Sequence, residues 1–134
     1  RLNDGMGSYI AAQLVKAMLK RKIQVNGSNV LVMGLSFKEN CPDIRNSGVV
    51  DIINEFKEYG TDVSVYDPWV DHQEVMDEYG ITVIDKPEGT YSAVILAVSH
   101  NQFLEMDMRD FVGNSGVIFD VKSALPKDNI DGRL

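Results

Sequence analysis

Residues 30–47 read VLVMGLSFKENCPDIRNS, an apolar run that passes through a glycine into a loop with two cationic side chains. A continuous apolar run is typical of a parallel strand that is covered on both faces of its sheet. Gly34 then allows a sharp turn of the backbone. In open α/β sheets, ligands bind outside the carboxyl ends of the strands. We therefore expect Lys38 and Arg45 to lie where an anionic group would be received.

The rest of the chain repeats the order of strand, loop and helix. The predicted elements, helices and strands together, cover residues 3–22, 30–33, 49–56, 63–66, 71–79, 81–84, 93–98 and 116–121. Strands that alternate with helices favour right-handed crossovers and a parallel sheet. The sequence thus predicts an α/β, Rossmann-like, doubly wound parallel sheet of about five strands. We expect residues 1–25 to be part of a long linker helix and residues 26–134 to form the sheet domain.

The first predicted helix carries a broad apolar stripe. Its members are Met6, Tyr9, Ile10, Leu14, Val15, Met18 and Leu19. A stripe this wide indicates packing on this domain's own sheet and also on a neighbouring domain or a second subunit. We expect a homodimer through this helix, and a plain covering helix is the alternative. Because the chain starts at Arg1, inside the helical pattern, we expect it to be a fragment of a larger protein.

The composition limits the classes of function. The net charge is −7, and residues 23–134 hold 8 basic and 19 acidic residues, so this part should repel a nucleic acid. The basic cluster at residues 20–22 is interpreted as cations that complement the dipole at a helix carboxyl end. The apolar runs are shorter than the about 20 residues of a membrane-spanning helix. The single cysteine, Cys41, excludes an intrachain disulfide, and a cytoplasmic location is expected.

Several familiar sites do not fit the sequence. The dinucleotide fingerprint G-x-G-x-x-G is absent, since Gly34 is followed by Leu35 and Ser36, so the domain should not bind NAD by itself. Asp67, after the second predicted strand, is interpreted as a turn-forming residue rather than a ribose ligand. A phosphoryl-accepting receiver domain fails because no acidic pair follows the first strand to hold Mg²⁺.

Cysteine and histidine chemistry also finds little support. Cys41 lies near two cations, which can activate a thiol, but no histidine is near it in the sequence to act as a base. His72 and His100 are both interpreted as solvated surface groups. Two separated histidines and one cysteine lack the spacing of metal ligands, so we expect no metal site.

The motif at residues 34–47 resembles the signature of the carboxyl-terminal, UDP-binding domain of the UDP-glucose/GDP-mannose dehydrogenase family. Other pieces agree in order with that family: residues 3–6 (NDGM) with the end of its central helix, 66–68 (YDP) with its second strand and 119–122 (FDVK) with its fifth. Residues 40–43 (NCPD) are most similar to the branch that oxidises UDP-N-acetylhexosamines, with N-acetylglucosamine or N-acetylgalactosamine as the sugar, for surface polysaccharides.

This resemblance implies an NAD-dependent enzyme with two domains. Such an enzyme oxidises the C6 alcohol of a UDP sugar to a carboxylate in two hydride transfers, through a thiol-linked intermediate. Its amino-terminal Rossmann domain holds NAD and supplies the catalytic cysteine, and neither that cysteine nor that glycine fingerprint lies in this sequence. The resemblance therefore implies that this chain holds no catalytic residue and should be inactive alone.

The resemblance also assigns site residues by position. Phe37 and Lys38 would contact the UDP moiety, and Arg45 would reach the NAD that the amino-terminal domain mainly binds. Lys122 stands where many relatives have an arginine that contacts the nucleotide, so we expect it in the substrate site. Cys41 stands where relatives often have threonine, and it is not the family's nucleophile.

Two questions stay open at this point. Asp43 could orient the guanidinium of Arg45 or cap the following helix, and we favour capping slightly, with Ser47 as the competing cap. The alternative function is a noncatalytic α/β interaction module that dimerises through its first helix and in which the loop cations are incidental. The sequence does not fix which UDP sugar the enzyme would prefer.

Overall fold

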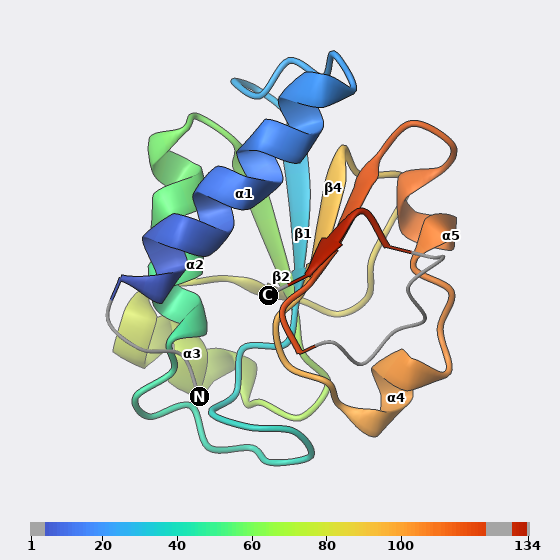
Figure 1. Cartoon of the computed structure of the whole chain (residues 1–134). Helices are drawn as coiled ribbons and strands as arrows, with labels where there is room; N and C mark the ends of the chain where they lie inside the picture. Colours follow the sequence, from blue (N-terminus) through green and yellow to red (C-terminus); the bar gives the residue numbers. More distant parts are fainter. Residues whose placement is uncertain (1–4, 123–129, 134) are drawn as a thin grey trace.

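A computed structural model describes residues 5–122 and 130–133 and shows a parallel sheet with helices on both faces (Figure 1). Within these residues the sheet has six strands in the order β3-β2-β1-β4-β5-β6. The strands are β1 (Asn29–Met33), β2 (Asp62–Tyr66), β3 (Val83–Ile84), β4 (Ala93–Leu96), β5 (Val117–Asp120) and β6 (Gly132–Arg133). The helices are α1 (Met6–Lys20), α2 (Val49–Glu58), α3 (His72–Tyr79), α4 (Asn101–Leu104) and α5 (Arg109–Val112).

The predicted α/β fold is confirmed, with some differences in the elements. The strand predicted at residues 93–98 ends at Leu96, because the N–H groups of Ala97 and Val98 both donate to the carbonyl oxygen of Met33. The sixth strand β6 and the helices α4 and α5 were not predicted, because elements of two to four residues show no periodicity. The helix predicted at residues 3–22 is α1, and residues 1–4 lie outside the described part.

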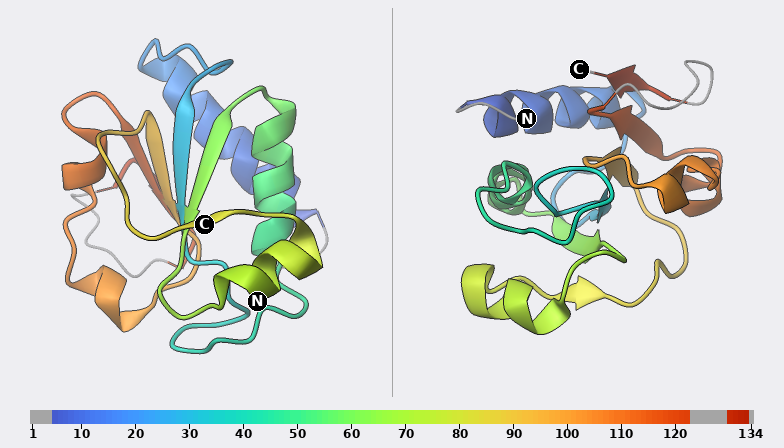
Figure 2. Two further views of the ribbon diagram at one scale, coloured as in Figure 1. Left: turned by 180° about the vertical axis from the view of Figure 1, so that it is seen from behind. Right: turned by 90° about the horizontal axis from the view of Figure 1, so that it is seen from below.

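The two faces of the sheet are covered by different helices. Figures 1 and 2 show α1 lying across one face of the sheet beside α2. Residues of these helices form one core cluster with alternate strand residues such as Val30 and Val32. The intervening residues, such as Leu31 and Met33, pack with Phe103 of α4 and with α5 on the other face. This alternation within an apolar strand explains why β1 is buried on both sides.

Most apolar side chains of helix α1 are buried against other parts of this chain. Ile10, Leu14 and Met18 are completely buried against the sheet side of the domain. Tyr9 and Leu19, by contrast, are 53% and 59% exposed. The packing predicted on the domain's own sheet is therefore confirmed, and the second surface stays a prediction. None of the helices in the described residues is long and apolar enough to cross a membrane.

The start and the end of α1 are both fixed to neighbouring elements. A Cβ atom on Gly7 would lie 2.9 Å from Cβ of Asp51, so α1 approaches α2 at a position where only glycine fits. At the other end, Lys20 lies in the last turn and Arg21 is the C-cap residue, which confirms that the basic cluster lies at a helix carboxyl end. Arg21 also donates to the carbonyl oxygen of Gly116 at 3.0 Å and pairs with Asp131.

The strand order reverses between β1 and β4, which makes this the topological switch point of the sheet. At the end of β1, Gly34 has a φ of +97°, and a Cβ atom there would lie 2.6 Å from Cβ of Val98. Glycine is therefore required both for the backbone conformation and for the close approach to the end of β4. The loops after β1 and β4 and residues 121–122, which follow β5, meet at this edge.

Candidate functional site

A small hollow lies at the switch point and brings together residues from distant parts of the chain. It encloses about 20 Å³ and is lined by Ser36, Phe37, Asn46, Gly48, Val49, Ala97, Val98 and Lys122. Phe37 comes from the loop after β1, and Lys122 comes from the end of β5. Two of the residues expected to contact the nucleotide are thus neighbours in space, beside the amino-terminal end of α2.

The position of Lys122 is set by the end of its strand. Asp120, the last residue of β5, is completely buried, and its carboxylate accepts a hydrogen bond from the N–H of Lys122 at 3.0 Å. The N–H of Val121 donates to the carbonyl oxygen of Leu96, which ties the same segment to β4. The Lys122 side chain is exposed, so its ammonium is accessible to an anionic ligand.

A second hollow lies beside the first and shares Phe37 and Asn46 with it. It measures about 300 Å³ and is also lined by Asp43 and Arg45. Phe37, which is 36% exposed, therefore stands between the surface that holds Lys122 and the surface that holds Arg45. Lys38 is exposed and lines neither hollow. The structure brings together three of the four predicted site residues, and the ligands assigned to all four stay predictions.

Arg45 is held by a neighbour in the sequence. Its Nε donates to Oδ1 of Asp43 at 3.1 Å, and its terminal nitrogen donates to Oδ2 at 2.9 Å. The Arg45 guanidinium, together with the Arg45 N–H, lowers the pKa of the Asp43 carboxyl to about 2. The arginine side chain is nevertheless 82% exposed, so its outer donors face solvent.

The expectation that Asp43 caps the following helix is wrong. Gly48 is the N-cap of α2, and no side chain caps that position. Ser47 lies closer to the capping role, because its Oγ accepts from the N–H of Val49 at 3.3 Å and donates to the carbonyl oxygen of Leu35. Asp43 does not cap α2 because both of its carboxylate oxygens accept hydrogen bonds from the Arg45 guanidinium.

A buried carboxylate anchors the start of the loop. Oδ2 of Asp67 accepts hydrogen bonds from the N–H groups of Leu35 at 2.7 Å and Ser36 at 3.0 Å, and Oδ1 accepts from the N–H of Trp69 at 2.8 Å. Burial raises the pKa of Asp67, but the hydrogen bonds from His100 and from these three N–H groups lower the pKa more. Asp67 thus stays ionised at neutral pH. The predicted role of Asp67 as a turn-forming residue accounts only for the hydrogen bond that it accepts from the N–H of Trp69.

The interpretation of His100 as a solvated surface group is wrong. Its side chain is completely buried, and its ring stacks on that of Trp69 with centroids 5.9 Å apart. Nε2 lies 3.0 Å from Oδ2 of Asp67, and Nδ1 accepts a hydrogen bond from the N–H of Asn40 at 2.9 Å. The residue before α4 turns inward because these two polar partners are available there. One feature of the sequence could have indicated that Asp67 and His100 lie close together. Each of them follows one of the two strands that flank β1.

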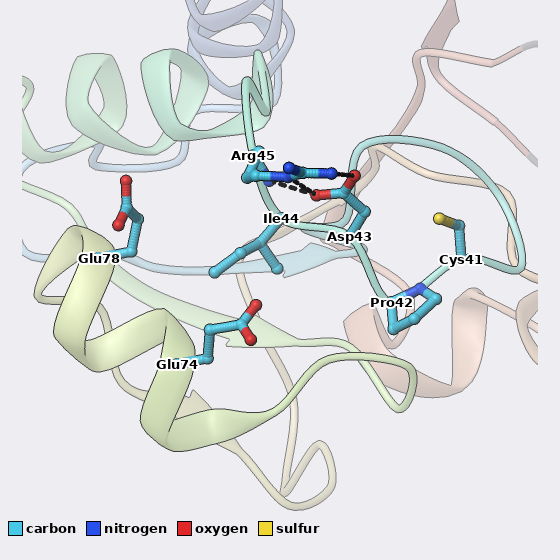
Figure 3. Close-up of a pocket in the computed structure, with 7 residues that line it drawn as sticks. All are labelled: Cys41, Pro42, Asp43, Ile44, Arg45, Glu74 and Glu78. Atoms are coloured by element: carbon cyan, nitrogen blue, oxygen red, sulfur yellow. Dashed lines mark hydrogen bonds and ion pairs between the residues drawn. The ribbon is translucent and has the colours of Figure 1, made fainter.

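Figure 3 shows a third hollow, between the loop and helix α3. It measures about 540 Å³ and is lined by Cys41, Pro42, Asp43, Ile44, Arg45, Glu74 and Glu78. Cys41 is a free, half-buried thiol.

The other histidine, His72, lies at the start of α3 and is exposed, with its Nδ1 atom 3.7 Å from Oδ1 of Asp85. No group of three or more potential metal-ligating side chains occurs in the described residues.

The turn after β1 does not offer the backbone donors that a dinucleotide needs. In a dinucleotide site, N–H groups at the first strand–helix turn face the pyrophosphate. Here the N–H groups of Leu35 and Ser36 already donate to Asp67, and Leu35 is completely buried. The residues present at this turn therefore do not fit NAD, in agreement with the missing glycine fingerprint.

Residues 31–127 match the UDP binding domain of the UDP-glucose/GDP-mannose dehydrogenase family. The whole chain is 52% identical to UDP-N-acetyl-D-glucosamine 6-dehydrogenase of Pseudomonas aeruginosa and 47% identical to the same-named protein of Salmonella typhi. It is also 41% identical over its whole length to the protein CapL of Staphylococcus aureus. The chain spans about one third of the length of each of these relatives.

Solved structures show the same fold. The crystal structure of an NDP-N-acetyl-D-galactosaminuronic acid dehydrogenase from Methanosarcina mazei superposes with a TM-score of 0.85 at 20% identity, over 97% of this chain and 29% of that one. The UDP-D-ManNAc dehydrogenase from Pyrococcus horikoshii gives a TM-score of 0.78 at 23% identity, over 98% of this chain and 31% of that one. With the match of residues 31–127 to the family's UDP binding domain, the chain therefore belongs to the UDP-glucose/GDP-mannose dehydrogenase family.

Proposed function

We propose that this chain is the UDP-sugar-binding part of an NAD-dependent UDP-N-acetylhexosamine 6-dehydrogenase, which supplies uronic acids for surface polysaccharides. The observation that carries the proposal is the match of the whole chain, at 52% and 47% identity, to two proteins named UDP-N-acetyl-D-glucosamine 6-dehydrogenase. The hollow that brings Phe37 next to Lys122 supports it, since a nucleotide diphosphate needs an aromatic surface and a cation side by side.

In this proposal the nucleotide lies across the mouth of the switch-point hollow, because the hollow itself is only about 20 Å³. Phe37 offers part of its ring to the uracil or the ribose. Lys122 places a positive charge beside the amino-terminal end of α2, where the helix dipole also favours a phosphate. Lys38, one residue from Phe37, supplies a second ammonium from the exposed side of the loop.

The chemical step is assigned to another part of the enzyme. NAD would supply the hydride acceptor, and the turn after β1 has no free N–H pair to hold it. Arg45, with its exposed guanidinium, would reach NAD from this side. We assign no catalytic residue to this chain and propose that it is inactive alone. The partner would be an amino-terminal Rossmann domain, and the location would be cytoplasmic.

A second contact surface is proposed on α1. Tyr9 and Leu19 are exposed by more than half although they lie on a helix whose other apolar residues are mostly buried. Large exposed apolar side chains on one helix favour a protein contact, and we propose a homodimer through α1. The same surface would serve the alternative function, an interaction module that binds no nucleotide.

Calorimetric titration separates the two functions. The chain is titrated with UDP, with UDP-N-acetylglucosamine and with NAD under the same conditions. The proposed function predicts saturable binding of both UDP compounds and no measurable binding of NAD. The interaction module predicts that none of the three binds, while light scattering still reports a dimer that Tyr9→Ala or Leu19→Ala weakens. Binding of NAD but not of UDP would overturn the proposal.

A further inference from the structure

Two of the residues expected to meet the nucleotide, Phe37 and Lys38, lie on a short segment that is fixed at both ends by one buried pair. At its start, the N–H of Ser36 donates to Asp67, and at its end the N–H of Asn40 donates to His100. Asp67 and His100 are themselves joined at 3.0 Å. Phe37 and Lys38 lie between the two anchor points and are both exposed. The pair thus fixes both ends of the segment, and within the segment the N–H of Phe37 also donates to the carbonyl oxygen of Asp43 at 2.6 Å.

The hydrogen bonds assign different roles to the two ring nitrogens of His100. A backbone N–H can only donate, so the Nδ1 atom that faces Asn40 must carry a lone pair. Nε2 therefore carries the proton that it donates to the Asp67 carboxylate, and it lies 3.3 Å from Oγ of Ser36. His100 thus bridges Asp67 and Asn40, with one donor and one acceptor both in use.

The segment also has internal support that depends on the same pair. Oγ of Ser36 donates to the carbonyl oxygen of Lys38 at 2.9 Å, which folds the chain back on itself. Asn40 has a φ of +55°, and its side chain exchanges two hydrogen bonds with Asn101. Because a left-handed asparagine is held only by its surroundings, the loop needs these contacts to keep its conformation. None of these contacts involves Arg45 or Lys122.

We propose that Asp67 and His100 are positioning residues for nucleotide binding: they hold residues 36–40 so that Phe37 and Lys38 meet the UDP moiety. This inference rests on the proposed function, because it names the residues that prepare the same site. The pair touches no ligand itself. Its role is to remove the freedom that the segment would otherwise lose on binding, so its loss should weaken affinity without removing any contact residue.

The test compares His100→Phe with His100→Gln. Phenylalanine keeps a ring in the buried space but has neither donor nor acceptor, whereas glutamine can still donate to Asp67 and accept from Asn40. We expect His100→Phe to bind UDP about tenfold more weakly and His100→Gln to stay within about threefold of the original chain. His72→Gln, which changes an exposed histidine outside this network, is the matched control and should bind UDP unchanged.

A second experiment measures the stability of the segment 36–40 in the absence of any ligand. Amide hydrogen exchange of residues 36–40 should accelerate in His100→Phe, return in His100→Gln and stay unchanged in His72→Gln. Should His100→Phe fail to fold, Ser36→Ala tests the same segment with a smaller change, because it removes only the hydroxyl that supports Lys38. It should also accelerate exchange in this segment and weaken UDP binding by a few-fold.

The outcomes separate this inference from the proposed function. Unchanged exchange and unchanged UDP affinity in His100→Phe would overturn the positioning role while leaving UDP binding intact. Equal losses in His100→Phe and His100→Gln would also contradict it, since restored hydrogen bonds would then not matter. If the original chain binds no UDP, the proposed function fails, and the exchange rates still decide whether the pair holds the segment.

Discussion

The loop after β1 has two halves that are held in different ways. Residues 35–40 are fixed by Asp67 and His100, which are both almost completely buried. At residues 43–45 the backbone is held by Ile44, which is buried in the core and accepts a hydrogen bond from the Tyr79 hydroxyl. The side chains of Asp43 and Arg45, by contrast, form an ion pair in which the arginine is 82% exposed. A buried, charge-assisted network is much stronger than an exposed pair of neighbours in the sequence. The first half therefore presents a surface prepared by buried hydrogen bonds, while in the second half the exposed side chains of Asp43 and Arg45 depend on a weak surface interaction.

The largest expected effect is on folding stability and comes from Asp67→Ala. This change leaves the N–H groups of Leu35, Ser36 and Trp69 without their acceptor in the interior. We expect the free energy of unfolding to fall by about 3 kcal/mol or more in urea denaturation. Asp71→Ala is the control, since it removes one N-cap bond to Glu74 at the surface and should cost about 1 kcal/mol. Equal losses in the two variants would show that the buried network stabilises the fold no more than a surface cap does.

Lowering the pH should affect the stabilising roles of Asp67 and Asp43 to different extents. The pKa values of Asp67 and Asp43 both lie below the ordinary value, so each ionised carboxylate stabilises the fold above the unfolded-state pKa of about 3.9. That contribution is lost as the pH falls through the folded-state pKa. We expect Asp67→Asn to flatten the decline of stability between pH 5 and the acid limit, and Asp43→Asn to change it far less. Denaturation curves at a series of pH values measure both slopes, and a steeper effect of Asp43→Asn would contradict the account.

The next effect is on nucleotide affinity and concerns the two lysines. Lys122→Ala removes the cation that lines the switch-point hollow and should weaken UDP binding by about 1.5–3 kcal/mol, the range of one hydrogen bond to a charged group. Lys38→Ala, which removes an exposed lysine that lines neither hollow, should cause a smaller but measurable loss. Lys122→Arg keeps the charge and should bind UDP about as well. Calorimetry ranks the UDP affinities of the three variants. A larger loss of affinity in Lys38→Ala than in Lys122→Ala would contradict the proposal that the nucleotide lies at the hollow lined by Lys122.

The smallest effect is expected in the exposed half. Arg45→Ala removes a guanidinium that donates to Asp43, two residues away in the sequence, and surface pairs of this kind contribute little to stability. Both the midpoint of thermal unfolding and the affinity for UDP should stay as in the original chain. A clear drop in UDP affinity would show that the two halves of the loop act as one site, which would break the comparison.

The sequence predicts most of the fold because its central strands are strongly patterned. The apolar runs at β1, β4 and β5 and the glycine that closes β1 sufficed to predict a parallel sheet with a ligand site at the carboxyl end of β1. The two-residue strand β6 and the one-turn helices were beyond reach, since their positions depend on contacts such as that between Arg21 and Asp131. Short elements are fixed by tertiary partners rather than by local pattern.

The site was predicted less completely than the fold. The family resemblance assigned Phe37, Lys38, Lys122 and Arg45 to one site. Three of them line two adjoining hollows, and Lys38 lines neither. The burial of His100 was missed because its partners are 33 and 60 residues away in the sequence, at Asp67 and Asn40. The role of Asp43 was misjudged because a capping pattern and a bidentate pair with Arg45 look the same in a sequence.

The central claim is that the edge where β1, β4 and β5 end receives the UDP moiety. Nuclear magnetic resonance of the labelled chain during titration with UDP tests it most directly, because every amide reports its own surroundings. We expect saturable shifts at Phe37, Lys38 and Lys122 and at the start of α2, with little change along α3 and α5. Saturable shifts that are confined to another face of the sheet, or no shifts at all, would contradict it.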